Sequence, residues 1–289
     1  MRNAASFALA RNTDAMNIKA VDQSTICVQW RDFERAFEDT KPAFGNKNSD
    51  EFKSYYRNGV CNFGPAFEDL WSNLNRLLNQ LKHSSRTPLM TVFMEGAVSS
   101  GKTAVAAKFT AESDLPFVRM IAATSMVGVS EAQKVSVILK TFEDAYRSTN
   151  SIILIDDIER IIEYTPVGPR FLPSVLQALL VLIKRTPPEN CRLMIVATTS
   201  IIDQMENLQL AHAFNVTLHV SQLQSPKEIE TVLLEYADIS SDVAKVISES
   251  IDSPIGIKQL LMILEMAKAN SNNQITAESF IECLHTVGY

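Results

Sequence analysis

The residues best suited to chemistry form one short segment, Gly96-Ala-Val-Ser-Ser-Gly-Lys102-Thr103, which has the spacing of a phosphate-binding loop. Its glycines let the backbone bend so that successive N–H groups point at a phosphate, and a following helix presents its positive N-terminus to the same anion. The lysine can contact the β- and γ-phosphates, and the threonine hydroxyl can ligate Mg²⁺. The segment therefore predicts that ATP and Mg²⁺ are bound by Gly96, Ala97, Val98, Ser99, Ser100, Gly101, Lys102, Thr103 and Ala104.

Two carboxylates follow an aliphatic run farther along the chain. Residues 152–155 are Ile-Ile-Leu-Ile, and Asp156 and Asp157 come directly after them. A parallel strand would deliver these carboxylates to the sheet edge where open α/β folds bind ligands. We predict that Asp156 and Thr103 are the Mg²⁺ ligands.

Asp157 occupies the place where ATPases of this type usually have a glutamate that orients the attacking water. Its carboxylate is one methylene shorter, and a catalytic group must lie within about 3 Å of the water. We therefore predict a catalytic role for Asp157 and Lys102 but slow hydrolysis. The alternative is that the water shifts and activity survives.

Two weaker signals lie later in the sequence. Thr198, Thr199 and Ser200 end an apolar run, and a polar side chain there could reach the γ-phosphate or the water. We take Thr199 as the candidate, although threonine at a strand end is ordinary. Gly256 and Lys258 open a helical pattern, where the lysine could fold over the γ-phosphate; by pattern alone such a lysine is usually solvated.

The elements around these residues alternate between strand and helix. The predicted strands are residues 89–95, 116–122, 151–156, 191–198 and 215–220. This alternation predicts a mainly parallel five-stranded sheet with helices on both faces. After Pro226 only helical patterns follow. We divide the chain into a helical segment (1–45), a linker with one helix (46–88), an α/β ATP-binding subdomain (89–222) and a helical lid (223–289).

Composition argues against several functions. The 27 Lys and Arg against 33 Asp and Glu give a net charge of −6, so no nucleic-acid partner is expected. The longest apolar stretch, residues 175–183, is far shorter than the roughly 20 residues of a membrane span, so no direct membrane insertion is expected. The four cysteines form no CxxC pair, which favours reduced thiols.

Arginine is missing where a ring-forming ATPase usually inserts one into its neighbour's site. Arg192 is the last arginine, and residues 200–215 contain no basic residue except His212. Such an arginine is worth ~10³–10⁵ in rate where it operates. Arg160 and Arg170 are the nearest alternatives, and we expect them to be structural or interface residues.

Five segments of the sequence show a pattern more specific than a phosphate-binding loop alone. They are GAVSSGKTAVAAK, SIILIDDIERIIEYTPVGPRF, LQALLVLIKRTPP, MIVATTS and PIGIKQLLMILEM. Together these segments resemble the second AAA+ domain of the N-ethylmaleimide-sensitive fusion protein (vesicle-fusing ATPase) family. The similarity runs from about Asp32 to the C-terminus, and residues 1–45 resemble the end of the preceding AAA+ domain with its linker.

The resemblance implies an AAA+ P-loop NTPase that binds ATP tightly, hydrolyses it slowly and supports a homo-oligomer, a hexamer in the family. It implies a cytoplasmic protein, with the periphery of vesicle or Golgi membranes as a further location. SNARE disassembly with adaptor proteins is implied through domains absent from this chain. The resemblance also assigns Lys258 to the γ-phosphate, Gly59 and Val60 to adenine, and residues 126–128 to the ring's pore.

Two alternatives stay open. The first is a fully active AAA+ ATPase that remodels another protein substrate, with Arg160 or Arg170 as the arginine inserted into the neighbouring site. The second is a phosphotransferase with a phosphate-binding loop, although the sequence contains no recognisable acceptor site.

Overall fold

The structure, a computed structural model, describes residues 5–9, 27–39, 52–84, 86–168, 170–237, 239–270 and 275–288. The chain separates into two compact units, Met1–Asn46 and Lys47–Tyr289. In the first unit, helix α2 (Trp30–Asp39) carries Trp30 and Phe33, and both side chains are exposed. Residues 1–4, 10–26 and 40–45 of the predicted helical segment lie outside the described part.

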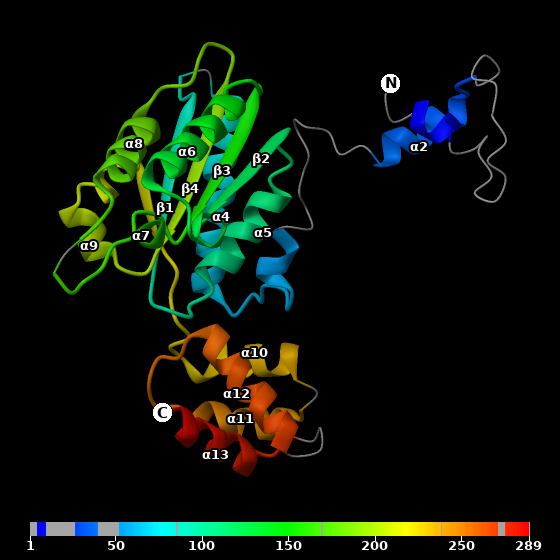
Figure 1. The fold of residues 1–289 in the computed structure, drawn as a ribbon. Helices are drawn as coiled ribbons and strands as arrows, with labels where there is room; N and C mark the ends of the chain where they lie inside the picture. The colour runs from blue at the N-terminus through cyan, green and yellow to red at the C-terminus, as the bar shows by residue number, and fades with distance from the viewer. Residues whose placement is uncertain are drawn as a thin grey trace. The chain divides into compact units, whose positions relative to one another are not determined.

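The second unit is built on a five-stranded sheet in which every pairing is parallel (Figure 1). The strand order is β2-β3-β4-β1-β5, so the three most buried strands lie in the middle. This confirms the predicted fold class, and each strand boundary differs from the prediction by at most one residue. The strands are β1 (Leu89–Glu95), β2 (Phe117–Ala122), β3 (Asn150–Asp156), β4 (Arg192–Thr199) and β5 (Val216–His219).

Alternate residues of the strands face two separate hydrophobic layers. On one face Leu154 and Val196 pack with α4 (Pro65–His83) and α5 (Lys102–Glu112). On the other face Ile155 and Ala197 pack with α6 (Glu131–Ala145) and α8 (Pro173–Lys184) (Figure 1). The short elements between them are η2 (Ser54–Tyr56), η3 (Ala123–Met126), α7 (Ile158–Ile161), α9 (Ile202–Asn207) and η4 (Ala211–Ala213).

The C-terminal part of the unit is helical, and we call it the lid. Its helices are α10 (Pro226–Tyr236), α11 (Ser241–Glu249), α12 (Ile257–Asn270) and α13 (Ala277–Val287). Ser225 and Glu228 form a capping box that starts α10, which explains why the helix begins directly after β5 and its connection. Buried residues of the lid, such as Leu233 and Leu260, belong to the same hydrophobic layer as α4 and α5.

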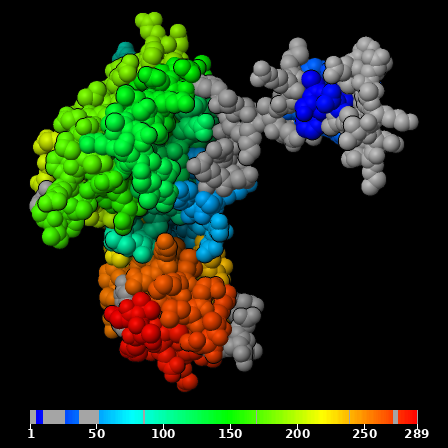
Figure 2. Space-filling model, viewed as in Figure 1, coloured from blue at the N-terminus to red at the C-terminus, as the bar shows by residue number. Residues whose placement is uncertain are grey.

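The lid lies against the segment that precedes α4 (light blue in Figure 2). The Sγ of Cys61 in that segment donates a hydrogen bond to Oε2 of Glu235 in α10, at 2.6 Å. Within the described residues, no helix is both long enough and apolar enough to cross a membrane.

Candidate nucleotide-binding site

The predicted phosphate-binding loop lies between the end of β1 and the start of α5. Its backbone takes positive φ angles at Gly96 (156°), Ser99 (67°) and Gly101 (92°). A Cβ atom on Gly96 would lie 2.4 Å from the carbonyl oxygen of Val220, a distance that real Cβ atoms essentially never show. Glycine at this position is therefore required for space as well as for conformation.

Lys102 lies inside this loop and is almost completely buried. Its Nζ donates to the carbonyl oxygens of Gly96 at 2.9 Å and Ala97 at 2.7 Å. Burial lowers the pKa of Lys102, and the nearby carboxylates of Glu159, Asp157, Asp156 and Glu95 oppose that shift. An ammonium group held at the loop backbone can exchange carbonyl partners for phosphate oxygens, which are stronger acceptors.

Asp156 and Thr103, the two predicted Mg²⁺ ligands, lie in contact. Asp156 is 7% exposed, and it accepts hydrogen bonds from the hydroxyls of Thr103 and Thr198. Burial raises the pKa of Asp156, with a smaller contribution in the same direction from Asp157, while the two hydroxyls lower it. A buried carboxylate beside a hydroxyl suits a hard cation such as Mg²⁺, because the cation compensates the buried charge.

The described residues contain no cluster of three or more Asp, Glu, His or Cys side chains that could hold a metal. Mg²⁺ usually binds through one or two protein oxygens together with substrate phosphates and water. Thr103 and Asp156 would therefore hold the ion jointly with bound ATP, whose phosphates the ion would neutralise.

Asp157, which directly follows the predicted Mg²⁺ ligand Asp156, has a strained backbone conformation. Its φ of 50° and ψ of 61° lie in the left-handed region, which aspartate tolerates better than most residues. Its N–H donates to Oγ1 of Thr198 at 2.9 Å, and its Oδ2 lies 3.7 Å from Nε of Arg160. The Arg160 side chain is 74% exposed, so this ion pair contributes little to stability.

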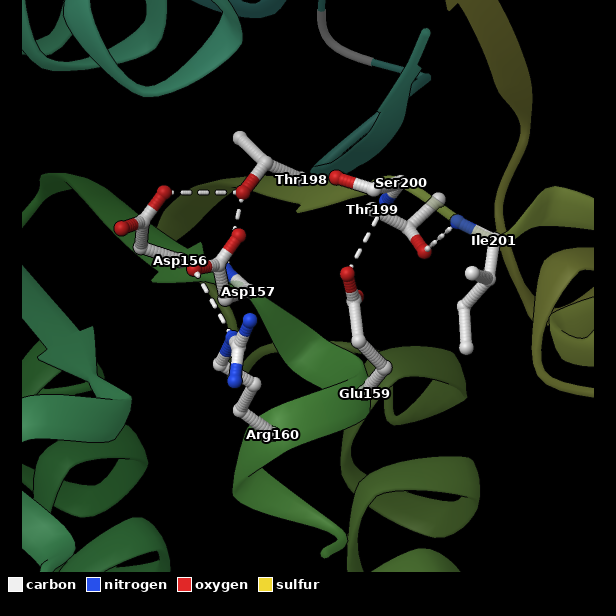
Figure 3. Close-up of polar contacts among 8 residues, drawn as sticks. All are labelled: Asp156, Asp157, Glu159, Arg160, Thr198, Thr199, Ser200 and Ile201. Carbon is white, nitrogen blue, oxygen red and sulfur yellow. Dashed lines mark hydrogen bonds and ion pairs between the residues drawn. The ribbon is translucent and has the colours of Figure 1, made fainter. Parts of the chain in front are cut away.

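The two threonines at the end of β4 have different partners (Figure 3). Thr198 bridges the acidic pair, because its hydroxyl donates to Oδ1 of Asp156 at 2.8 Å and accepts from the N–H of Asp157. The hydroxyl of Thr199, the predicted candidate, accepts from the N–H of Ile201 at 3.2 Å. Neighbouring strand residues point to opposite faces, so Thr198 meets the acidic pair and Thr199 does not. The predicted role of Thr199 at the γ-phosphate or the attacking water stays a prediction.

Glu159 is a further acidic residue of this site that sequence reasoning did not single out. It is 9% exposed, and its Oε1 accepts from the N–H of Ser200 at 3.0 Å (Figure 3). Its Oε2 is buried and has no hydrogen-bond partner among the described residues. Of the carboxylates that raise the pKa of Lys102, Glu159 contributes most. Its position on the short helix α7 resembles an ordinary exposed turn in sequence, which is why the pattern does not reveal it.

The predicted adenine contacts, Gly59 and Val60, lie at the junction of the linker and the lid. Gly59 has a φ of 79°, and its N–H donates to the carbonyl oxygen of Tyr56 at 2.9 Å. A Cβ on Gly59 would lie 3.5 Å from the hydroxyl of Tyr236 in α10. The structure thus places these residues beside the lid, and their contact with adenine stays a prediction.

Lys258 and Gly256 lie directly at the phosphate-binding loop. The N–H of Lys258 donates to the carbonyl oxygen of Ser99 at 3.1 Å. A groove of about 590 Å³ runs between the loop and α12, with Val98, Ser99, Lys258 and Met262 among its lining residues. The pore prediction for residues 126–128 stays a prediction; Val127 there is exposed.

A parallel sheet, a phosphate-binding loop after its first strand, an aspartate at the end of β3 and a helical lid define a P-loop ATPase domain. The family model described as "ATPase family associated with various cellular activities (AAA)" matches residues 92–222. The chain therefore carries a domain of the AAA family.

Proteins that fuse vesicles are similar to this chain over almost all of its length. It is 40% identical over 98% of its residues to the vesicle-fusing ATPase of Dictyostelium discoideum, covering 38% of that protein. It is 34% identical to the vesicle-fusing ATPase of Arabidopsis thaliana, with 98% of this chain and 40% of that protein covered. The vesicular-fusion protein SEC18 of Saccharomyces cerevisiae is 32% identical over 93% of this chain and 36% of the relative. These matches confirm the resemblance drawn from the motifs.

Proposed function

We propose that this chain is an ATP-binding AAA module of a vesicle-fusing ATPase, in which bound Mg-ATP supports assembly of a homo-oligomeric ring and is hydrolysed slowly. Lys102, Thr103 and Asp156 supply the parts for Mg-ATP binding. The observation that carries the slow hydrolysis is the geometry of Asp157. This residue has a short carboxylate, a left-handed backbone and a charged partner in Arg160.

The ring proposal rests on the family resemblance and on the position of the lid. ATP bound between the loop and the lid would hold both parts in one arrangement, as a regular ring requires. The curated relatives are named for vesicle fusion, and the chain spans only 38% to 40% of the first two. SNARE disassembly with adaptor proteins, in the cytoplasm and at the periphery of vesicle or Golgi membranes, is therefore proposed for the complete protein, and a hexamer is proposed from the family.

A second candidate function is that of an active ATPase that remodels another protein. Glu159 favours it, because it adds a carboxylate that acts on Lys102, and its buried Oε2 has no hydrogen-bond partner within the part of the chain that the structure describes. This function would also need Arg160 or Arg170 to enter a neighbouring subunit's site. Arg160→Ala and Arg170→Ala would then each be compared with the unchanged ring, and the candidate fails if neither slows hydrolysis.

The deciding experiment measures molar mass by light scattering and phosphate release in the same samples, with and without Mg-ATP. We expect rings with Mg-ATP, little phosphate release, and no rings for Lys102→Ala. Lys140→Ala, which removes an exposed lysine of α6, is the matched control and should assemble normally. A steady turnover of about one per second or faster, a rate usual for enzymes, would refute slow hydrolysis.

A further inference from the structure

The lid touches the phosphate-binding loop through backbone atoms. Gly256 directly precedes α12, and the N–H of Lys258 donates to the carbonyl oxygen of Ser99 at 3.1 Å. A Cβ on Gly256 would lie 2.8 Å from that same oxygen, and 2.9 Å from both the carbonyl carbon and the Cβ of Ser99. Ordinary Cβ contacts lie at 3.4–4 Å, so a side chain at Gly256 would push the lid away from the loop.

Space alone accounts for glycine at position 256. Its φ is not positive, so an alanine could adopt the same backbone conformation. Ser99 differs, because its φ of 67° lies in a region that few residues other than glycine adopt. Such strain persists only where the surrounding structure enforces it. The strained residue of the loop is therefore the one that accepts the hydrogen bond from the lid.

The start of the phosphate-binding loop, at Glu95 and Gly96, contacts the connection that leads from β5 to the lid. Val220 directly follows β5, and its carbonyl oxygen is the atom that a Cβ on Gly96 would strike. The N–H of Val220 donates to the carbonyl oxygen of Glu95 at 2.8 Å. Three residues later, Leu223 and Ile255 exchange two backbone hydrogen bonds of 3.0 Å each. The loop and the lid are thus joined in a closed path of backbone contacts.

We propose that the contact between Gly256 and Ser99, which we call the lid clasp, couples phosphate binding at the loop to the orientation of the lid. Gly256 is then a positioning residue and not a nucleotide contact, in contrast to its predicted role. Phosphate oxygens that bind the loop N–H groups fix the loop backbone. They thereby fix the carbonyl of Ser99, on which the first turn of α12 is seated.

The clasp rests on the proposed function, because it explains how ATP could set the lid for ring assembly. Gly256→Ala tests it, with Ser253→Ala as the matched control. Ser253 is exposed and lies on the same connection, three residues earlier. We expect Gly256→Ala to bind Mg-ATP about tenfold more weakly, a loss of about 1.4 kcal/mol, and to need correspondingly more ATP for assembly. Normal affinity and normal assembly of Gly256→Ala would overturn the clasp.

Amide hydrogen exchange at Lys258 gives a readout that a general loss of stability would not imitate. In the unaltered chain, Mg-ATP should slow exchange of this amide, because a fixed Ser99 carbonyl holds its hydrogen bond. The slowing should be absent in Gly256→Ala. An unchanged rate in the unaltered chain overturns the clasp even if the variant does not fold. If Mg-ATP slows exchange of the Lys258 amide but no ring forms, the lid clasp is supported and the proposed role in ring assembly is refuted.

Discussion

The hydroxyl of Thr198, near the end of β4, makes two hydrogen bonds to the acidic pair at the end of β3. It donates to Oδ1 of Asp156 at 2.8 Å and accepts from the N–H of Asp157 at 2.9 Å. Thr198→Val keeps the branched shape of the side chain and removes both bonds. The variant therefore tests whether Thr198 orders the acidic pair.

The expected loss follows from the groups left without a partner. A hydrogen bond to a charged group contributes about 1.5–3 kcal/mol, and leaving the N–H of Asp157 without its acceptor costs about 1–3 kcal/mol more. Because the carboxylate side of Asp157 is partly exposed, we expect the lower part of this range. The free energy of unfolding should fall by about 2.5–4 kcal/mol.

Thr199→Val is the matched control on the adjacent residue. Its hydroxyl accepts one hydrogen bond, from the backbone N–H of Ile201 at 3.2 Å. Losing a single neutral bond should lower the free energy of unfolding by about 1 kcal/mol. Both threonines are fully buried, so differences in solvent exposure cannot account for the contrast.

The assay is denaturant unfolding without nucleotide, followed by tryptophan fluorescence, to which Trp71 in α4 contributes. A Mg²⁺ titration in the presence of ATP should accompany it. Thr198→Val removes a bond that lowers the pKa of Asp156, so protons compete better with Mg²⁺ and the apparent Mg²⁺ affinity should fall. Equal losses for the two valine variants, or a larger loss for Thr199→Val, would refute the assignment of Thr198.

Three other predictions concern the acidic pair and the linker. Asp157→Glu should raise phosphate release about tenfold or more, because the carboxylate reaches farther; an unchanged rate would contradict the limit set by Asp157. Burial places the folded-state pKa of Asp156 above its usual value, so the folded chain without Mg-ATP holds the proton more tightly. The free energy of unfolding of the chain without Mg-ATP should therefore decline from about pH 4 upward. Unfolding measured at a series of pH values should show a flatter decline for Asp156→Asn. Burial and Glu235 raise the pKa of Cys61 to about 12, so iodoacetamide at pH 8 should label the exposed Cys27 well before Cys61 by mass spectrometry; faster labelling of Cys61 would contradict its burial.

Much of the fold could be predicted because the deciding signals are local in sequence. Each strand is a short apolar run with its own flanking turn, and the phosphate-binding loop is eight consecutive residues. The register that aligns the ends of β1, β3 and β4 follows from parallel pairing. Lys102, Thr103 and Asp156 therefore meet where the sequence predicts.

The remaining features depend on contacts between residues far apart in the chain. Which of Thr198 and Thr199 faces the acidic pair depends on the pleat of β4 beside β3, and one residue of shift reverses the answer. Glu159 belongs to the site because α7 turns it back toward the strand ends. Gly256 approaches Ser99 across more than 150 residues of sequence, and no local pattern encodes that distance. The sequence by itself determined the sheet and the order of the phosphate-binding loop, and it predicted ATP binding, because these features are encoded by neighbouring residues. Tertiary packing alone decided that Thr198 meets the acidic pair, that Glu159 bonds the N–H of Ser200 after β4, and that Gly256 approaches Ser99.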